Sequence, residues 1–363
     1  MSPTLAVSVT AETERDSVSL ATFNWQLFSH LEGVLNDQHR EKQNELQLGE
    51  TALFINGNLS NRLSYLYEGT YQPSRYRDDT FKNERWQLRY QLLAGHYLAA
   101  GKMHTPVNYW NDTYHHGRLF FPTISRPLSM DKLVPLHDNA LRLGGRNLGV
   151  YGFFYDLTAG SGHEYENEVF PEGVQSFTAS AGFEPYYGLT MRVGLHRNEA
   201  HKVGHGAHGS MPSTTAHGSM MPSHQHGAMP GMNMDMGMAT ASDDLQVLNL
   251  VAASLFLRSG KLEALTEAAW SRGSDNTENN AAFYQYLGFN VSEVVTPYAL
   301  LDWINLDRGP GFKEGVELRG GLGVKFVLGD TLDLKAELVR HRDGTLEASP
   351  SSVELRAQFS VGF

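Results

Sequence analysis

The sequence predicts an all-β fold, a transmembrane antiparallel β-barrel of about 16 strands, and three observations support this prediction. Apolar and polar residues alternate along much of the chain, and short turns alternate with longer polar loops. No uninterrupted apolar run reaches the ~18 residues that a membrane helix needs. The mean hydropathy of -0.36 still permits a membrane protein, because a barrel strand is apolar on one face only.

The last strand shows the alternation most clearly. From Val353 to Phe363, every odd position is apolar and every even position is polar or glycine. The segments 314–328 and 332–343 likewise place charged residues on one face and aliphatic residues on the other. Charged side chains need water, so the opposite face must meet a core or lipid.

Sixteen strands follow from this pattern, an even number that places both termini at one end of the barrel. The predicted strands are 24–36, 46–57, 62–72, 83–93, 96–104, 139–144, 147–158, 174–184, 189–199, 245–258, 261–273, 280–292, 295–307, 314–328, 332–343 and 351–363. The eight longer loops between them all fall at the other end. This asymmetry is typical of barrels in the bacterial outer membrane, with both termini in the periplasm and the long loops outside.

The domain organisation is one barrel, residues 23–363, preceded by a short segment. Residues 1–22 are either the remnant of a secretory signal, with Val9 and Ala11 placed like a cleavage site, or an N-terminal tail in the periplasm. The net charge of -11 argues against a nucleic-acid partner, and zero cysteines exclude thiolate metal sites. Neither a glycine-rich phosphate loop nor a His-Glu-x-x-His motif occurs, so no enzymatic activity is predicted.

The segments 358–363 and 100–108 resemble the general and phosphate-selective porins, sixteen-stranded barrels that end in an aromatic residue. The resemblance spans roughly residues 20–363. It implies passive diffusion of small hydrophilic solutes, a surround of outer-membrane lipid and a homotrimer. It also implies that Phe363 belongs to the signal read by the barrel-assembly machinery.

The third long loop, residues 105–138, follows the fifth strand, where porins fold a loop inward to constrict the pore. The polar residues predicted to line that constriction are Asn108, Asn111, His115, His116 and Arg118. The apolar residues predicted to pack against the wall are Leu119, Phe120, Phe121 and Ile124. The alternative is an external flap over the barrel mouth.

Charged residues on the predicted inner faces carry both signs, which indicates a hydrated wall or a transverse field across the constriction and favours neither anions nor cations. These predicted lumen residues are Arg89, Lys102, Arg192, Glu263, Glu267, Asp302, Glu317, Arg319, Lys325, Lys335, Glu337, Glu354 and Arg356.

The loop 200–243 is rich in His and Met and holds eight of the chain's 12 Met residues. Thioether and imidazole ligands on a chain with no core-forming residues predict a disordered loop that binds copper or another soft metal. The loop also resembles the His/Met-rich runs of copper-resistance proteins of the outer membrane and periplasm. The alternative is a biased linker without ligands. The candidate ligands are His201, His205, His208, Met211, His217, Met220, Met221, His224, His226, Met229, Met232, Met234, Met236 and Met238.

Three hypotheses for function remain. The first is a porin-like channel with a metal-binding loop. The second is a barrel dedicated to copper resistance or uptake, and the third is a structural or surface barrel plugged by residues 105–138.

Overall fold

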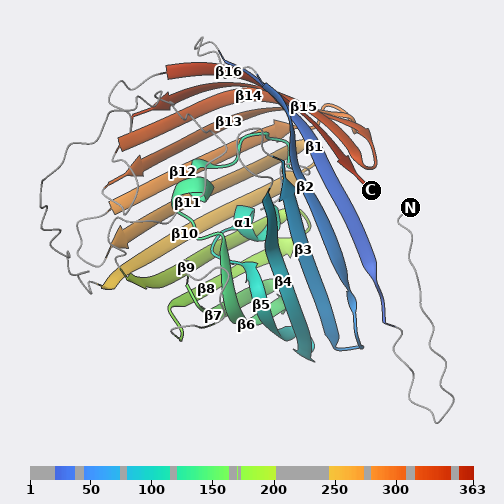
Figure 1. The fold of residues 1–363 in the computed structure, drawn as a ribbon, viewed down its shortest axis with the longest axis vertical. Coiled ribbons are helices and arrows are strands. Elements are labelled where there is room, and N and C mark those ends of the chain that lie inside the picture. Colours follow the sequence, from blue (N-terminus) through green and yellow to red (C-terminus); the bar gives the residue numbers. More distant parts are fainter. Residues whose placement is uncertain are drawn as a thin grey trace, which may run out of the picture.

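The computed structural model is a closed barrel in which every strand pairs antiparallel with its neighbours in sequence (Figure 1). The structure describes residues 21–36, 45–73, 80–114, 121–162, 170, 173–201, 245–273, 279–307, 315–344 and 351–363. Within these residues there are sixteen strands, as the sequence predicts. The first and last strands pair, with Phe28 opposite Gly362, and this pairing closes the barrel.

The strand boundaries agree with the predicted ranges to within a few residues except between the sixth and seventh strands. The strands are β1 (Asn24–Asn36), β2 (Glu45–Asn58), β3 (Leu63–Gln72), β4 (Thr80–Leu93), β5 (His96–His104), β6 (His137–Leu148), β7 (Phe153–Gly160), β8 (Ser176–Tyr186), β9 (Leu189–His201), β10 (Leu245–Ser259), β11 (Leu262–Gly273), β12 (Asn279–Phe289), β13 (Val295–Leu306), β14 (Gly315–Gly329), β15 (Leu332–Asp343) and β16 (Ser351–Gly362).

The turn predicted at residues 144–147 is wrong, because β6 continues through it. The chain turns instead at Gly149 and Gly152, whose φ angles of 66° and 58° favour glycine. Gly144 has a different role within the strand. A Cβ at this position would lie 2.3 Å from Cζ of Tyr97, so the glycine leaves room for the tyrosine ring of the neighbouring strand.

The alternation along β16 sorts side chains between the outside and the inside of the barrel. Leu355 and Phe359 are 47% and 36% exposed, whereas Gln358 and Ser360 are 0% and 3% exposed. The same separation recurs around the barrel, where large aliphatic and aromatic side chains are exposed and most inward-facing polar ones are buried. The predicted assignment of apolar and polar faces along β16 is therefore confirmed.

The two ends of the barrel differ in the length of their connections. The ends of β1 and β16 that lie nearest the chain termini share one end with the short turns. The connections at the other end are longer and include residues 105–136 and the connection from β9 to β10.

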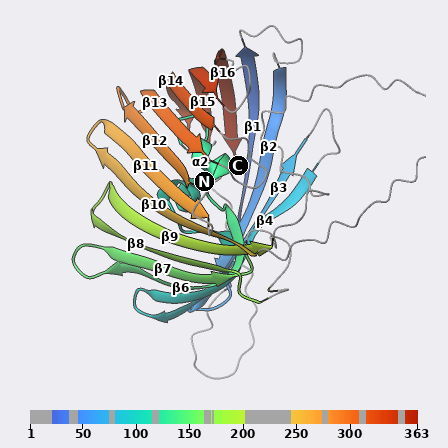
Figure 2. The same cartoon turned by 90° about the vertical axis from the view of Figure 1, so that its left-hand side faces the viewer.

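The described residues 105–114 and 121–136 carry two short helices, α1 (Tyr109–Tyr114) and α2 (Leu128–Lys132), and lie inside the barrel (Figures 1 and 2). They contact β10, β12 and β13. Within the described residues, no helix is long and apolar enough to cross a membrane.

Candidate functional site

The described residues 105–114 and 121–136, here called the inward segment, fill one side of the barrel interior. Trp110 and Phe121 are 2% and 1% exposed and belong to a cluster with apolar side chains of β10 to β13. Phe121 packs on Tyr286 of β12, with ring centroids 4.6 Å apart. Burial of these aromatic rings stabilises the segment against the wall.

A buried carboxylate of β11 binds the first helix of the inward segment. Glu267 accepts hydrogen bonds from the backbone N–H of Trp110 at 2.7 Å and from the Asn108 amide at 3.0 Å. The Ser254 hydroxyl donates to the same carboxylate at 3.0 Å. Several donors therefore compensate for the loss of water around Glu267.

Two further carboxylates bind the second half of the segment. Glu337 of β15 accepts from the backbone N–H of Ile124 at 3.0 Å and from the Tyr298 hydroxyl at 2.9 Å. Asp302 of β13 accepts from the backbone N–H of Leu128 at 2.8 Å. Backbone donors that would otherwise be buried without a partner thus find charged acceptors on the wall.

Side-chain pairs add to this attachment. Lys132 at the end of α2 forms an ion pair with Glu317 of β14. Arg356 of β16 donates to the Ser125 hydroxyl at 2.9 Å. Charged residues on the inner faces of β11 and of β13 to β16 therefore hold the inward segment.

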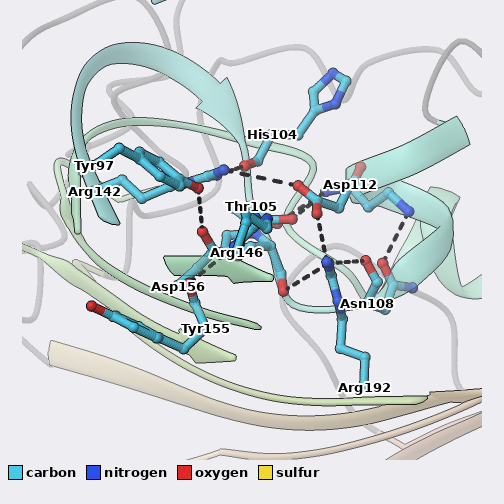
Figure 3. A network of polar contacts seen from close by, with 12 residues as sticks. Tyr97, His104, Thr105, Asn108, Asp112, Arg142, Arg146, Tyr155, Asp156 and Arg192 are labelled. Atoms are coloured by element: carbon cyan, nitrogen blue, oxygen red, sulfur yellow. Dashed lines mark hydrogen bonds and ion pairs between the residues drawn. The ribbon is translucent and has the colours of Figure 1, made fainter. Parts of the chain in front are cut away.

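The facing wall, β4 to β9, carries arginines that belong to a different network (Figure 3). Asp156 of β7 is 0% exposed and accepts from the Tyr97 hydroxyl at 2.7 Å and from Arg146 at 2.8 Å. The arginines of this wall that face the interior near the inward segment and the turn end are Arg89, Arg142, Arg146 and Arg192.

Aromatic rings alternate with these guanidinium groups. Cζ of Arg89 lies 3.7 Å from the ring centroid of Tyr97, and Cζ of Arg146 lies 5.6 Å from the same ring. Cζ of Arg192 lies 5.0 Å from the centroid of Phe154. Contact with a ring face restricts a long, flexible side chain and favours its cation.

Asp112 of α1 connects the inward segment to this wall. Its carboxylate lies 2.7 Å from Arg192 and 3.9 Å from Arg142. Burial disfavours the charged carboxylate, but the two arginines outweigh it and hold the pKa of Asp112 below its ordinary value. The segment is therefore tied to both sides of the interior.

A cavity of about 270 Å³ lies against β3 to β6. Three of its lining side chains are arginines and none is a carboxylate. We call it the arginine pocket, and its lining residues are Ser64, Tyr65, Leu66, Gln87, Arg89, Tyr97, Arg142 and Arg146.

Two residues predicted to line a constriction have another role. Asn108 and Asn111 are 2% and 0% exposed, so their amides do not face an open passage. Asn111 donates to the backbone carbonyls of Thr105 at 3.0 Å and Leu136 at 2.9 Å, which joins the two ends of the inward segment. The two amides thus satisfy buried partners, and their predicted role in a pore constriction stays a prediction.

The other predicted constriction residues and nearly all predicted metal ligands lie outside the described residues. These are His115, His116 and Arg118, and every ligand candidate after His201, which is the last residue of β9. No group of three or more His, Asp or Glu that could hold a metal occurs in the described part of the chain.

Some of the charges predicted for the lumen contact the inward segment, whereas others, such as Lys325 with Asp333 and Lys335 with Gln358, pair along the wall. Glu267, Asp302 and Glu337 bind the inward segment. Sequence reasoning did not single out Arg142 or Arg146 of the facing wall. The alternation of Arg142 with its exposed neighbours Leu141 and Leu143 was the available signal for the first of these.

Comparison with known proteins supports the fold. The sequence matches no protein-family model and no curated protein. Among solved structures, an anion-selective porin from Comamonas acidovorans is similar, with a TM-score of 0.60 at 9% identity over 94% of this chain and 100% of that chain.

Two other solved structures agree. The outer-membrane channel DcaP of Acinetobacter baumannii gives a TM-score of 0.59 at 9% identity, covering 96% of this chain and 99% of that chain. The trimer form of OmpT, an outer-membrane protein of Vibrio cholerae, gives a TM-score of 0.59 at 13% identity, covering 94% of this chain and 99% of that chain. The chain therefore shares the closed antiparallel barrel fold of these outer-membrane proteins.

Proposed function

We propose that the protein is a channel of a bacterial outer membrane through which small hydrophilic solutes diffuse passively. The observation that carries this proposal is a barrel with an apolar outside and a charged inside, narrowed by an inward segment that is fixed mainly to one wall. The anion-selective porin and the outer-membrane channel that share the fold agree with it.

The outer surface supports a lipid environment. Leu46, Leu322 and Leu338 are 67%, 66% and 51% exposed on different strands. So many exposed aliphatic side chains would make a protein in water aggregate, whereas lipid accommodates them. By analogy with outer-membrane barrels, we place the short turns and both termini in the periplasm and the long connections outside.

The inner surface supports a passage along one side. The inward segment fills the side formed by β10 to β13. The arginine pocket lies on the other side, against β3 to β6. Solutes would therefore pass between the segment and the wall that carries the arginines.

Conductance in planar lipid bilayers tests the channel. The refolded protein is expected to give stepwise increases in current, and heat-denatured protein is the control. A variant with a short Gly-Ser linker in place of residues 107–134 should conduct more, because the interior is then less obstructed. No current from the wild-type protein at any voltage would contradict the proposal and favour a plugged barrel.

Assembly follows from the same proposal. We expect a homotrimer, as in the trimer form of OmpT, which size measurement by multi-angle light scattering in detergent tests. Phe363 follows β16 and pairs through its backbone with Leu27 of β1. As the assembly signal, Phe363 should be needed for insertion in cells, so Phe363→Ala should lower the amount of folded barrel in outer-membrane fractions.

Copper binding by the His/Met loop is a second candidate function. The flanking strands β9 and β10 both end at the side of the long connections, so the loop would lie at the cell surface in the proposed orientation. Copper(I) titration of the whole protein and of a variant without residues 202–238 tests it. Equal binding by the two proteins would remove the loop as a copper site.

A further inference from the structure

We propose that the arginine pocket binds the carboxylate or phosphate group of a solute in transit. This inference rests on the proposed channel function and names the class of solute that the channel favours. The shared chemistry is that of an oxyanion, which matches the paired N–H donors of a guanidinium group.

The pocket lies towards the turn end of the interior. Ser64 and Tyr97 are the second residues of β3 and β5, which both begin at a short turn. Arg89 and Arg146 lie within the last five residues of β4 and β6, which both end at one. The pocket is therefore distinct from the carboxylates of β11, β13 and β15 that hold the inward segment.

The charge around the pocket is not balanced. The carboxylate beside it, Asp156, is 0% exposed and already accepts from Arg146 and Tyr97. The next carboxylate, Asp112, is paired with Arg192 at 2.7 Å and lies 3.9 Å from Arg142. Across these residues and Arg89, four guanidinium groups face two carboxylates, which leaves a net positive charge.

Arg89 offers donors to a ligand, and Arg142 adds positive charge. In the described part of the chain, no carboxylate forms an ion pair with Arg89, whose guanidinium is held over the ring of Tyr97. Arg142 is 6% exposed, donates to the backbone carbonyl of His104 and lies 3.9 Å from Asp112. An oxyanion in the pocket would accept from Arg89 and interact favourably with the charge of Arg142.

Tyr97 is a positioning residue for this site. Its ring lies in the space that Gly144 leaves open, and its hydroxyl group donates to Asp156. The ring in turn supports the guanidinium groups of Arg89 and Arg146. Because the donors are held before the ligand arrives, less side-chain entropy is lost on binding.

The rest of the lining admits a small solute. Ser64 and Gln87 add neutral hydrogen-bonding groups, and Leu66 adds an apolar side chain. The volume of about 270 Å³ accommodates a small carboxylic acid or inorganic phosphate but no large polymer.

Isothermal titration calorimetry of the refolded full chain in a zwitterionic detergent tests the site. Succinate and inorganic phosphate are titrated separately, with glycerol as the neutral comparison. Arg89→Gln should weaken binding about tenfold or more, because a charge-assisted hydrogen bond and a positive charge are lost. Arg62→Gln is the matched control, since this arginine is exposed at the β2–β3 turn and does not line the pocket.

A second variant keeps every arginine. Gln87→Glu changes little in size and places a carboxylate in the lining, so it should also abolish most of the binding. Heat-dependent gel mobility shows whether each variant is folded. Tighter binding of succinate would identify the oxyanion as a carboxylate, and tighter binding of inorganic phosphate would identify it as a phosphate.

Failure of the site and failure of the channel give different results. Anion binding without any conductance would contradict the channel and leave the site in place. Conductance in a protein that binds neither acid, or equal losses in Arg89→Gln and Arg62→Gln, would overturn the site and leave the channel.

Discussion

The two sides of the barrel interior are built by the same alternation of residues but use their charges differently. On the side of β11, β13 and β15, carboxylates such as Glu267 and Glu337 accept backbone N–H groups of the inward segment. On the side of β4 to β6, Arg89, Arg142 and Arg146 line a cavity that no carboxylate lines. Charged residues on an inner face can therefore either stabilise the channel structure or bind solutes. The hydrogen-bond partners of each residue distinguish the two cases.

The largest expected effect on stability comes from the wall that binds the inward segment. Glu337→Ala removes the acceptor for the backbone of Ile124 and for the Tyr298 hydroxyl, so buried donors lose their partner. We expect a loss of about 3 kcal/mol in the free energy of unfolding, measured by urea denaturation in detergent. Glu293→Ala, in the exposed β12–β13 turn, is the control. Equal stability of the two variants would contradict the role of Glu337.

The next effect comes from the packing beneath the arginine pocket. Gly144→Ala places a methyl group 2.3 Å from Cζ of Tyr97 and forces the ring to move. The expected cost is about 1–3 kcal/mol in the same assay, together with weaker anion binding. Gly320→Ala in β14 is the matched control, because nothing lies within 4 Å of its Cβ position. Unchanged stability and anion binding in Gly144→Ala would show that the ring position is not constrained.

A smaller effect tests the contact between the two sides. The arginines hold the pKa of Asp112 below its ordinary value of 3.8, so the ion pairs stabilise the fold above that pH and are lost as the pH falls through the lowered pKa. Asp112→Asn should cost about 1–2 kcal/mol at pH 7. The difference from wild type should shrink as the pH falls through the lowered pKa of Asp112, and a constant difference across the titration would contradict this.

The smallest effect is expected outside the interior. Arg197 and Glu199 form an exposed pair at 2.9 Å on β9, with the arginine side chain 53% exposed. Arg197→Gln should change the free energy of unfolding by less than about 0.5 kcal/mol. A larger change would show that exposure alone does not separate structural charges from dispensable ones.

The period-two pattern was sufficient to predict the barrel, its strand number and its inner and outer faces. It was insufficient at residues 144–147, because a glycine that makes room for Tyr97 and a glycine in a turn look alike in sequence. The roles of Asn108 and Asn111 were also not predictable, since residue type does not reveal which buried carbonyl or carboxylate an amide will meet. Contacts between residues far apart in the chain decided both cases.

The seam between the first and last strands has a consequence for synthesis and folding. Leu27 and Phe363 exchange backbone hydrogen bonds of 3.2 and 2.9 Å, and β1 finds its second neighbour only in β16. Until β16 has been made, the growing sheet keeps two unpaired edges that can join to other chains. The ring can therefore close only after β16 has been synthesised, so the pairing that completes the barrel joins the first and the last strand to be made.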